Sequence, residues 1–144
     1  MTPAAIFSLC NSVAMAGWII LIFFPFWNQS DKFIIGIIIT LFAIVYAWLL
    51  VGSFNISDTK KFGSLQGVME LFTNPTVVTA GWIHYLAFDL LTGVFIKKNA
   101  AKHNISHWWL IPCLFLTFMV GPVGLLLYLI TRFIITKNYF AANY

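Results

Sequence analysis

Two ionisable side chains, His84 and Asp89, lie in the apolar stretch GWIHYLAFDL at residues 81–90. A histidine and a carboxyl group held away from water are suited to general acid–base chemistry, because their surroundings adjust how readily each gives up or takes a proton. An ionised side chain at the centre of a lipid bilayer costs roughly 2.5 to 3.5 kcal/mol even on a permissive scale. Residues placed there are therefore candidates for function.

The composition is that of a membrane protein. Of 144 residues, 61% are hydrophobic, 18% are aromatic and 8% are charged, and the mean hydropathy is +0.92. Because a helix needs about 20 mostly apolar residues to cross roughly 30 Å of hydrocarbon, the charge-poor runs predict four spanning helices, at residues 5–27, 33–54, 75–97 and 107–133. The sequence therefore predicts an all-α integral membrane four-helix bundle that occupies residues 1–144 as a single domain.

The third predicted helix places both ionisable residues near its middle. Asn74 and Pro75 form a start signal, since Asn caps free amides and Pro at the first helical position loses no hydrogen bond. Because a helix turns about 100° per residue, His84 and Asp89 lie about 140° apart around it. His84 shares its face with small residues, which also fits close helix packing and a structural hydrogen bond. Asp89 lies on an edge with Tyr85, four residues earlier.

The neighbouring segments contribute further candidates. A short amphipathic stretch, SLQGVMELFTNP at residues 64–75, carries Glu70, which is either a solvated glutamate or an inward-facing carboxyl group. In the fourth predicted helix, Gly121 precedes Pro122, and a proline inside a helix removes a hydrogen bond and kinks the axis. A kink in lipid must pack against protein or line a cavity, and such cavities commonly hold ligands.

These segments together resemble the abscisic acid deficient four-like family. The resemblance is carried by GWIHYLAFDLLTG and HWWLIPCLFLTFMVGPVGLLLY, by SLQGVMELFTNP upstream, and at the N-terminus by Phe7, Asn11, Trp18 and Pro25. Plant members of the family are required for neoxanthin formation and are described as neoxanthin synthase. The chain departs from the family pattern at Val94, Asn99 and Ser106, where a basic residue, an acidic residue and a proline are usual. These departures leave the substrate open.

The resemblance implies a carotenoid isomerase, or a required partner of one, that acts on an epoxide in the membrane. Converting an epoxide end group to an allenic alcohol needs an acid for the epoxide oxygen and a base for a proton on the adjoining polyene carbon, with no cofactor and no metal. We predict Asp89 as the acid and His84 as the base, with Glu70 as a substitute for either. The residues expected to contact the ligand are Tyr85, Trp82, Asn74, His107 and Thr117.

Other functions use the same residues. A non-catalytic carotenoid- or lipid-binding protein, or a partner subunit, would use the cavity without converting its ligand. A haem protein could ligate iron through His84 and His107, and two histidines are the smallest number that would serve such a site. An ion carrier could use Asp89 as a relay, but the chain has no series of carboxylates to continue it.

Charge and the N-terminus bear on partners and location. The net charge of +4, with lysines at 97, 98 and 102, is expected to face anionic lipid rather than nucleic acid. In a four-span arrangement the eight basic residues divide four to four between the two sides, so the positive-inside rule gives no orientation. The N-terminus shows no Arg-rich or Ser-rich leader, so we expect a bacterial inner membrane or a plastid-like membrane. A homodimer would enlarge the cavity and is left open.

Overall fold

The structure is a computed structural model that describes residues 1–53 and 56–137. Within these residues the chain forms α1 (Pro3–Phe23), α2 (Ser30–Phe33), the π-helical turn η1 (Ile34–Ile39), α3 (Thr40–Ser53), the 3-10 helix η2 (Ile56–Gly63), α4 (Leu65–Leu71), α5 (Pro75–Lys102), α6 (His107–Val120) and α7 (Pro122–Thr136). The described residues contain no strand. The all-α prediction is therefore confirmed for this part of the chain.

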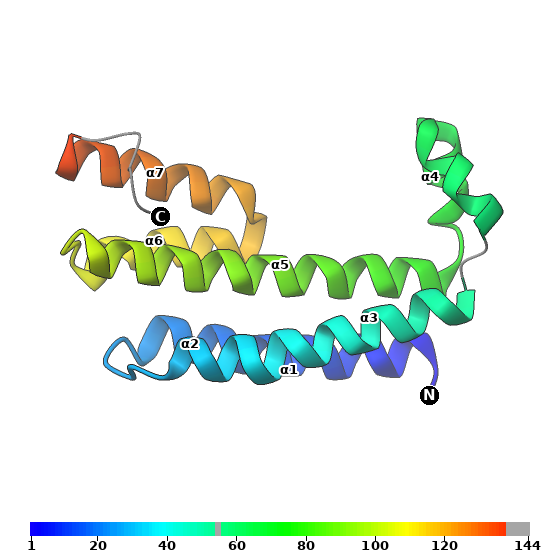
Figure 1. Cartoon of the computed structure of the whole chain (residues 1–144), viewed down its shortest axis with the longest axis horizontal. Coiled ribbons are helices and arrows are strands. Elements are labelled where there is room, and N and C mark those ends of the chain that lie inside the picture. Colours follow the sequence, from blue (N-terminus) through cyan, green and yellow to red (C-terminus); the bar gives the residue numbers. More distant parts are fainter. Residues whose placement is uncertain (54–55, 138–144) are drawn as a thin grey trace.

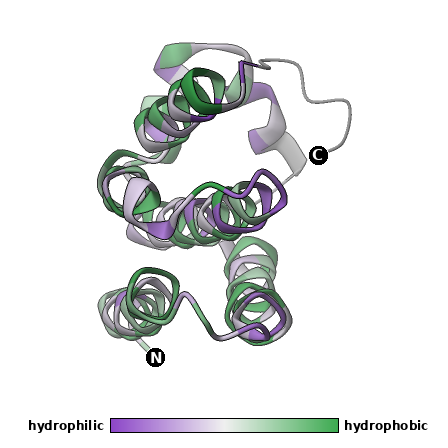
Figure 2. Cartoon of the chain, turned by 90° about the vertical axis from the view of Figure 1, so that its left-hand side faces the viewer, coloured by the Kyte–Doolittle hydropathy of each residue, from purple (hydrophilic) through white to green (hydrophobic). Residues whose placement is uncertain are grey.

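Among the described residues, three helices are long and apolar enough to cross a membrane: Pro3–Phe23, Ser30–Ser53, in which α2, η1 and α3 run on without a break, and Pro75–Lys102. These correspond to the first three predicted spans. Helix α5 lies between α1 and α3 on one side and the α6–α7 pair on the other (Figure 2). Gly93 allows the close approach of α1, because a Cβ there would lie 2.9 Å from Leu21 Cδ1 and 3.0 Å from the Trp18 ring.

The fourth predicted span is instead a hairpin of two helices. Helix α6 ends at Val120 and α7 begins at Pro122, and the two lie antiparallel against each other (Figure 1). With 14 and 15 residues, they are about 21 to 23 Å long, shorter than the roughly 30 Å of a hydrocarbon core. The predicted kink at Gly121-Pro122 is thus a reversal of the chain, and the predicted four-helix bundle is corrected to three long helices and a hairpin.

Small residues make this reversal possible. Pro122 has no N–H to continue the hydrogen bonding of α6. Gly124, two residues further on, lies directly on α6: a Cβ at this position would overlap Thr117 N, Thr117 Oγ1 and the Cys113 carbonyl oxygen. The absence of a side chain at Gly124 therefore lets the first turn of α7 rest on the backbone of α6.

The segment before α5 stands away from the bundle at one end (Figure 1). The predicted amphipathic stretch forms the short helix α4, which Ser64 caps by accepting a hydrogen bond from Gly67 N at 3.1 Å. Asn74 caps α5 as predicted, because its Oδ1 accepts from Thr76 N at 2.9 Å. Helix α5 ends at Lys102 rather than near Lys97.

Candidate functional site

His84 and Asp89 point to different sides of α5. The His84 ring faces α3, with its centroid 5.4 Å from that of Tyr46, and lies 4.6 Å from the ring of Phe88 on its own helix. Asp89 faces the α6–α7 turn, where its Oδ1 occupies the space that a Cβ on Gly121 would need. The structure therefore does not bring the predicted acid and base together.

Asp89 forms a buried polar site with the residues around it. Its side chain is 7% exposed, and it hydrogen bonds with Tyr85, one helical turn earlier. Asp89 lies near the middle of Pro75–Lys102, so the α6–α7 turn also lies at this height. Helix α7 begins at Pro122, and the free amides at a helix N-terminus favour a nearby negative charge. The carboxyl group thus has both a hydrogen-bond partner and a favourable helix end.

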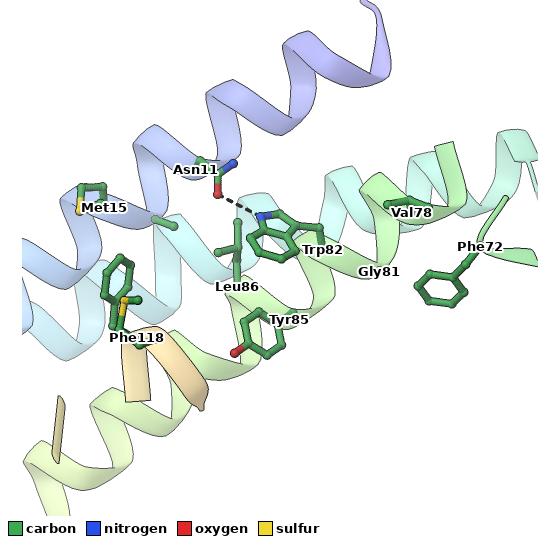
Figure 3. Close-up of a pocket in the computed structure, with 11 residues that line it drawn as sticks. Asn11, Met15, Phe72, Val78, Gly81, Trp82, Tyr85, Leu86 and Phe118 are labelled. Atoms are coloured by element: carbon green, nitrogen blue, oxygen red, sulfur yellow. Dashed lines mark hydrogen bonds between the residues drawn. The ribbon is translucent and has the colours of Figure 1, made fainter. Parts of the chain in front are cut away.

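A groove of about 690 Å³ runs beside this site, and Tyr85 is one of its walls. It lies between α1, α5 and the end of α6 (Figure 3). Trp82 points across it to α1 and donates from Nε1 to Asn11 Oδ1 at 2.9 Å. The remaining walls are almost wholly apolar: Ala14, Met15, Phe72, Val78, Gly81, Leu86, Phe118 and Met119. The groove therefore suits a hydrophobic molecule with a polar group near Tyr85.

The structure divides the predicted ligand-contacting residues. Trp82 and Tyr85 line the groove, whereas Asn74 is occupied as the cap of α5. His107 lies at the start of α6, with Nε2 2.8 Å from the Ile22 carbonyl oxygen. Thr117 is fully buried, and its Oγ1 donates to the Cys113 carbonyl oxygen at 2.8 Å. The last three side chains hold helices in place and do not line this groove.

Glu70 is remote from the groove. It is exposed on α4, and its Oε1 lies 2.9 Å from Lys61 Nζ, which also lies 3.3 Å from Asp58 Oδ1. The hydrogen bonds that Lys61 donates to the carboxylates of Glu70 and Asp58 hold its pKa above the ordinary value, because both favour the charged ammonium. Glu70 thus belongs to a surface ion-pair cluster that joins α4 to η2.

His84 lines a second groove, of about 370 Å³, between α3 and α5. Its side chain is exposed, whereas the His107 ring is fixed at the end of α1. The two histidines therefore do not meet as a pair of iron ligands would. Within residues 1–53 and 56–137, no group of three or more His, Cys, Asp or Glu side chains could hold a metal ion.

Sequence reasoning did not assign Asn11 to the site, although the residue was visible as a lone amide in the charge-free N-terminal helix. The sequence indicated that Gly121 takes part in a kink with Pro122, but not that it contacts Asp89. No sequence signal indicated that contact, because it depends on the reversal at residues 121–122.

Fold and site together define a class: a helical protein with three helices suited to cross a membrane, a short helical hairpin, and a buried carboxyl group at the hairpin turn. The model of the family described as ABA DEFICIENT 4-like matches residues 5–128. The chain belongs to this family, as its sequence resemblance predicted. No curated protein and no solved structure matches it.

Proposed function

We propose that the three long helices cross a bacterial inner membrane or a plastid-type membrane, and that the protein acts there on a carotenoid or related polyprenoid. The reaction is an isomerisation that opens an epoxide end group without a cofactor. The observation that supports it best is the Asp89–Tyr85 pair beside an apolar groove of about 690 Å³. That volume is in the range of ligand sites and accommodates one end ring with part of a polyene.

Asp89 performs both proton transfers in this proposal. The protonated Asp89 carboxyl group gives its proton to the Tyr85 hydroxyl, whose own proton passes to the epoxide oxygen, and the ring carbon–oxygen bond breaks. The carboxylate that remains takes back a proton through the same hydroxyl, which accepts it from the adjoining polyene carbon, and the electron pair of that carbon–hydrogen bond forms the new double bond of the allene. Substrate and product are isomers, and Asp89 is regenerated. His84 has no part in these steps because it faces α3.

The test is conversion of an epoxy-xanthophyll by the purified protein in nanodiscs, followed by chromatography and mass spectrometry for an isomer of unchanged mass. We expect Asp89→Asn to reduce the rate at least about 100-fold, since positioned proton transfer contributes about 100- to 10,000-fold. Tyr85→Phe should reduce it to a similar extent, because the hydroxyl that lines the groove carries both protons. His84→Phe is the matched control on the same helix and should convert at the wild-type rate. Full activity in folded Asp89→Asn would refute the assignment.

A non-catalytic carotenoid- or lipid-binding role is the second candidate, and the almost wholly apolar groove wall favours it. Here Asp89 serves only to hold the α6–α7 turn. The protein would then purify with bound pigment in a fixed ratio, and Trp82→Ala would release the pigment. No isomer would form from any epoxide offered.

A further inference from the structure

Six of the eight basic residues gather at one end of the molecule. The reason is the hairpin: α7 runs back toward the end where α6 begins, which is also the end that carries α2 (Figure 1). Tyr128 Oη and Arg132 Nη1 donate to Asn99 Oδ1 at 2.6 and 3.0 Å, and so fix the last turns of α7 beside the last turns of α5. We name this region the cationic end; its basic residues are Lys32, Lys97, Lys98, Lys102 and Lys137, together with Arg132, which is buried.

The two ends differ strongly in charge. At the cationic end Asp31 is the one acidic side chain, bound to Lys98 at 3.0 Å, so six positive charges against one negative leave +5. At the opposite end Lys60 and Lys61 are balanced by Asp58 and Glu70, which leaves zero. With Asp89 between the ends, these values account for the net charge of +4.

Two buried polar nitrogens lie at the same end. Asn99 is 2% exposed, and its Nδ2 has no hydrogen-bond partner among the described residues. The same is true of Nε2 of His103, the residue that follows the end of α5. Buried polar atoms are ordinarily paired, so this end has unused hydrogen-bonding capacity beneath the lysines that would meet the anionic oxygens of a lipid phosphate.

We propose that the cationic end binds the phosphate groups of anionic lipid and faces the side of the membrane from which the chain is inserted. A four-span chain would divide its basic residues four to four between the sides. The hairpin moves Arg132 and Lys137 across, which makes the division six to two, and the positive-inside rule then gives an orientation. The N-terminus and the connection that carries Lys60 lie on the opposite side. The inference stands whether or not the protein is an enzyme.

Orientation is tested with single cysteines at exposed lysines in a Cys10→Ala, Cys113→Ala background, in bacterial cells. Lys102→Cys and Lys137→Cys should react with a membrane-impermeant maleimide only in inverted vesicles, and Lys60→Cys only in intact cells. If residue 137 reacts from the same side as residue 60, the hairpin argument fails. If residues 102 and 137 both react in intact cells, the orientation is wrong.

Lipid binding is tested on the intact protein by titrating phosphatidylglycerol into a phosphatidylcholine background, read by native mass spectrometry. Lys32→Gln, Lys102→Gln and Lys137→Gln should each weaken the affinity roughly fivefold. Lys60 is also exposed but lies at the other end, so Lys60→Gln is the control and should leave the affinity unchanged. Equal losses for all four variants would overturn the proposal. Stabilisation by inorganic phosphate as strong as that by phosphatidylglycerol would overturn the assignment to lipid.

Discussion

Replacing Gly124 with alanine tests whether residues 107–136 form a hairpin. In the structure an added Cβ at Gly124 would overlap Thr117 N, Thr117 Oγ1 and the Cys113 carbonyl oxygen. Two of these three atoms belong to the backbone of α6 and cannot rotate away. In a single continuous helix, residues 117 and 124 would instead lie about 10 Å apart, and the alanine would meet neither group.

The expected sign of the effect therefore depends on the fold. Overpacking a close contact costs about 1 to 3 kcal/mol, and separation of α6 from α7 would add the loss of the buried surface they share. In a continuous helix the same substitution would stabilise the protein by up to about 1 kcal/mol, because alanine is the better helix former. The two arrangements thus predict changes of opposite sign.

The measurement is the free energy of unfolding in mixed detergent micelles titrated with sodium dodecyl sulfate. Gly52→Ala in α3 is the matched control, since a Cβ there meets nothing within 4 Å. We expect Gly124→Ala to be less stable than this control by at least about 1 kcal/mol. A Gly124→Ala protein as stable as the Gly52→Ala protein would refute the hairpin.

Three further substitutions test separate contacts. Gly93→Ala should destabilise the protein by about 1 to 3 kcal/mol in the same titration, because the added Cβ meets Trp18 and its neighbours on α1; an unchanged midpoint would contradict the packing of α1 on α5. His107→Phe should lower the free energy of unfolding by about 1 to 3 kcal/mol, because it removes the hydrogen bond to the Ile22 carbonyl oxygen at the end of α1. The folded variant should keep the wild-type turnover. Asn99→Asp should raise the free energy of unfolding by about 1 kcal/mol, because Arg132 then donates to a charged acceptor. The same variant should bind anionic lipid more weakly. A lower free energy of unfolding would contradict the contact between Arg132 and residue 99.

Much of the fold follows from local sequence. Three charge-poor runs predict the three long helices, since the length and hydrophobicity that a membrane requires are properties of the segment alone. The start of α5 is equally local: Asn74 accepts from Thr76 N, two residues away, and Pro75 fits the first turn. The sequence also shows, without a structure, that α5 carries two ionisable side chains, Asp89 and His84, in an otherwise apolar stretch.

The arrangement of the site was decided by contacts between distant segments. Gly121-Pro122 interrupts helical hydrogen bonding in a kink and in a reversal alike, so the pair alone does not distinguish them. The reversal depends on Gly124 resting on α6, and on Asp89 filling the space beside Gly121. Helical spacing already sets His84 and Asp89 about 140° apart around α5, and packing decides that His84 meets α3 and Asp89 meets the hairpin. The sequence determined which residues lie on the apolar helices, and tertiary packing decided which of them are buried and which of them meet.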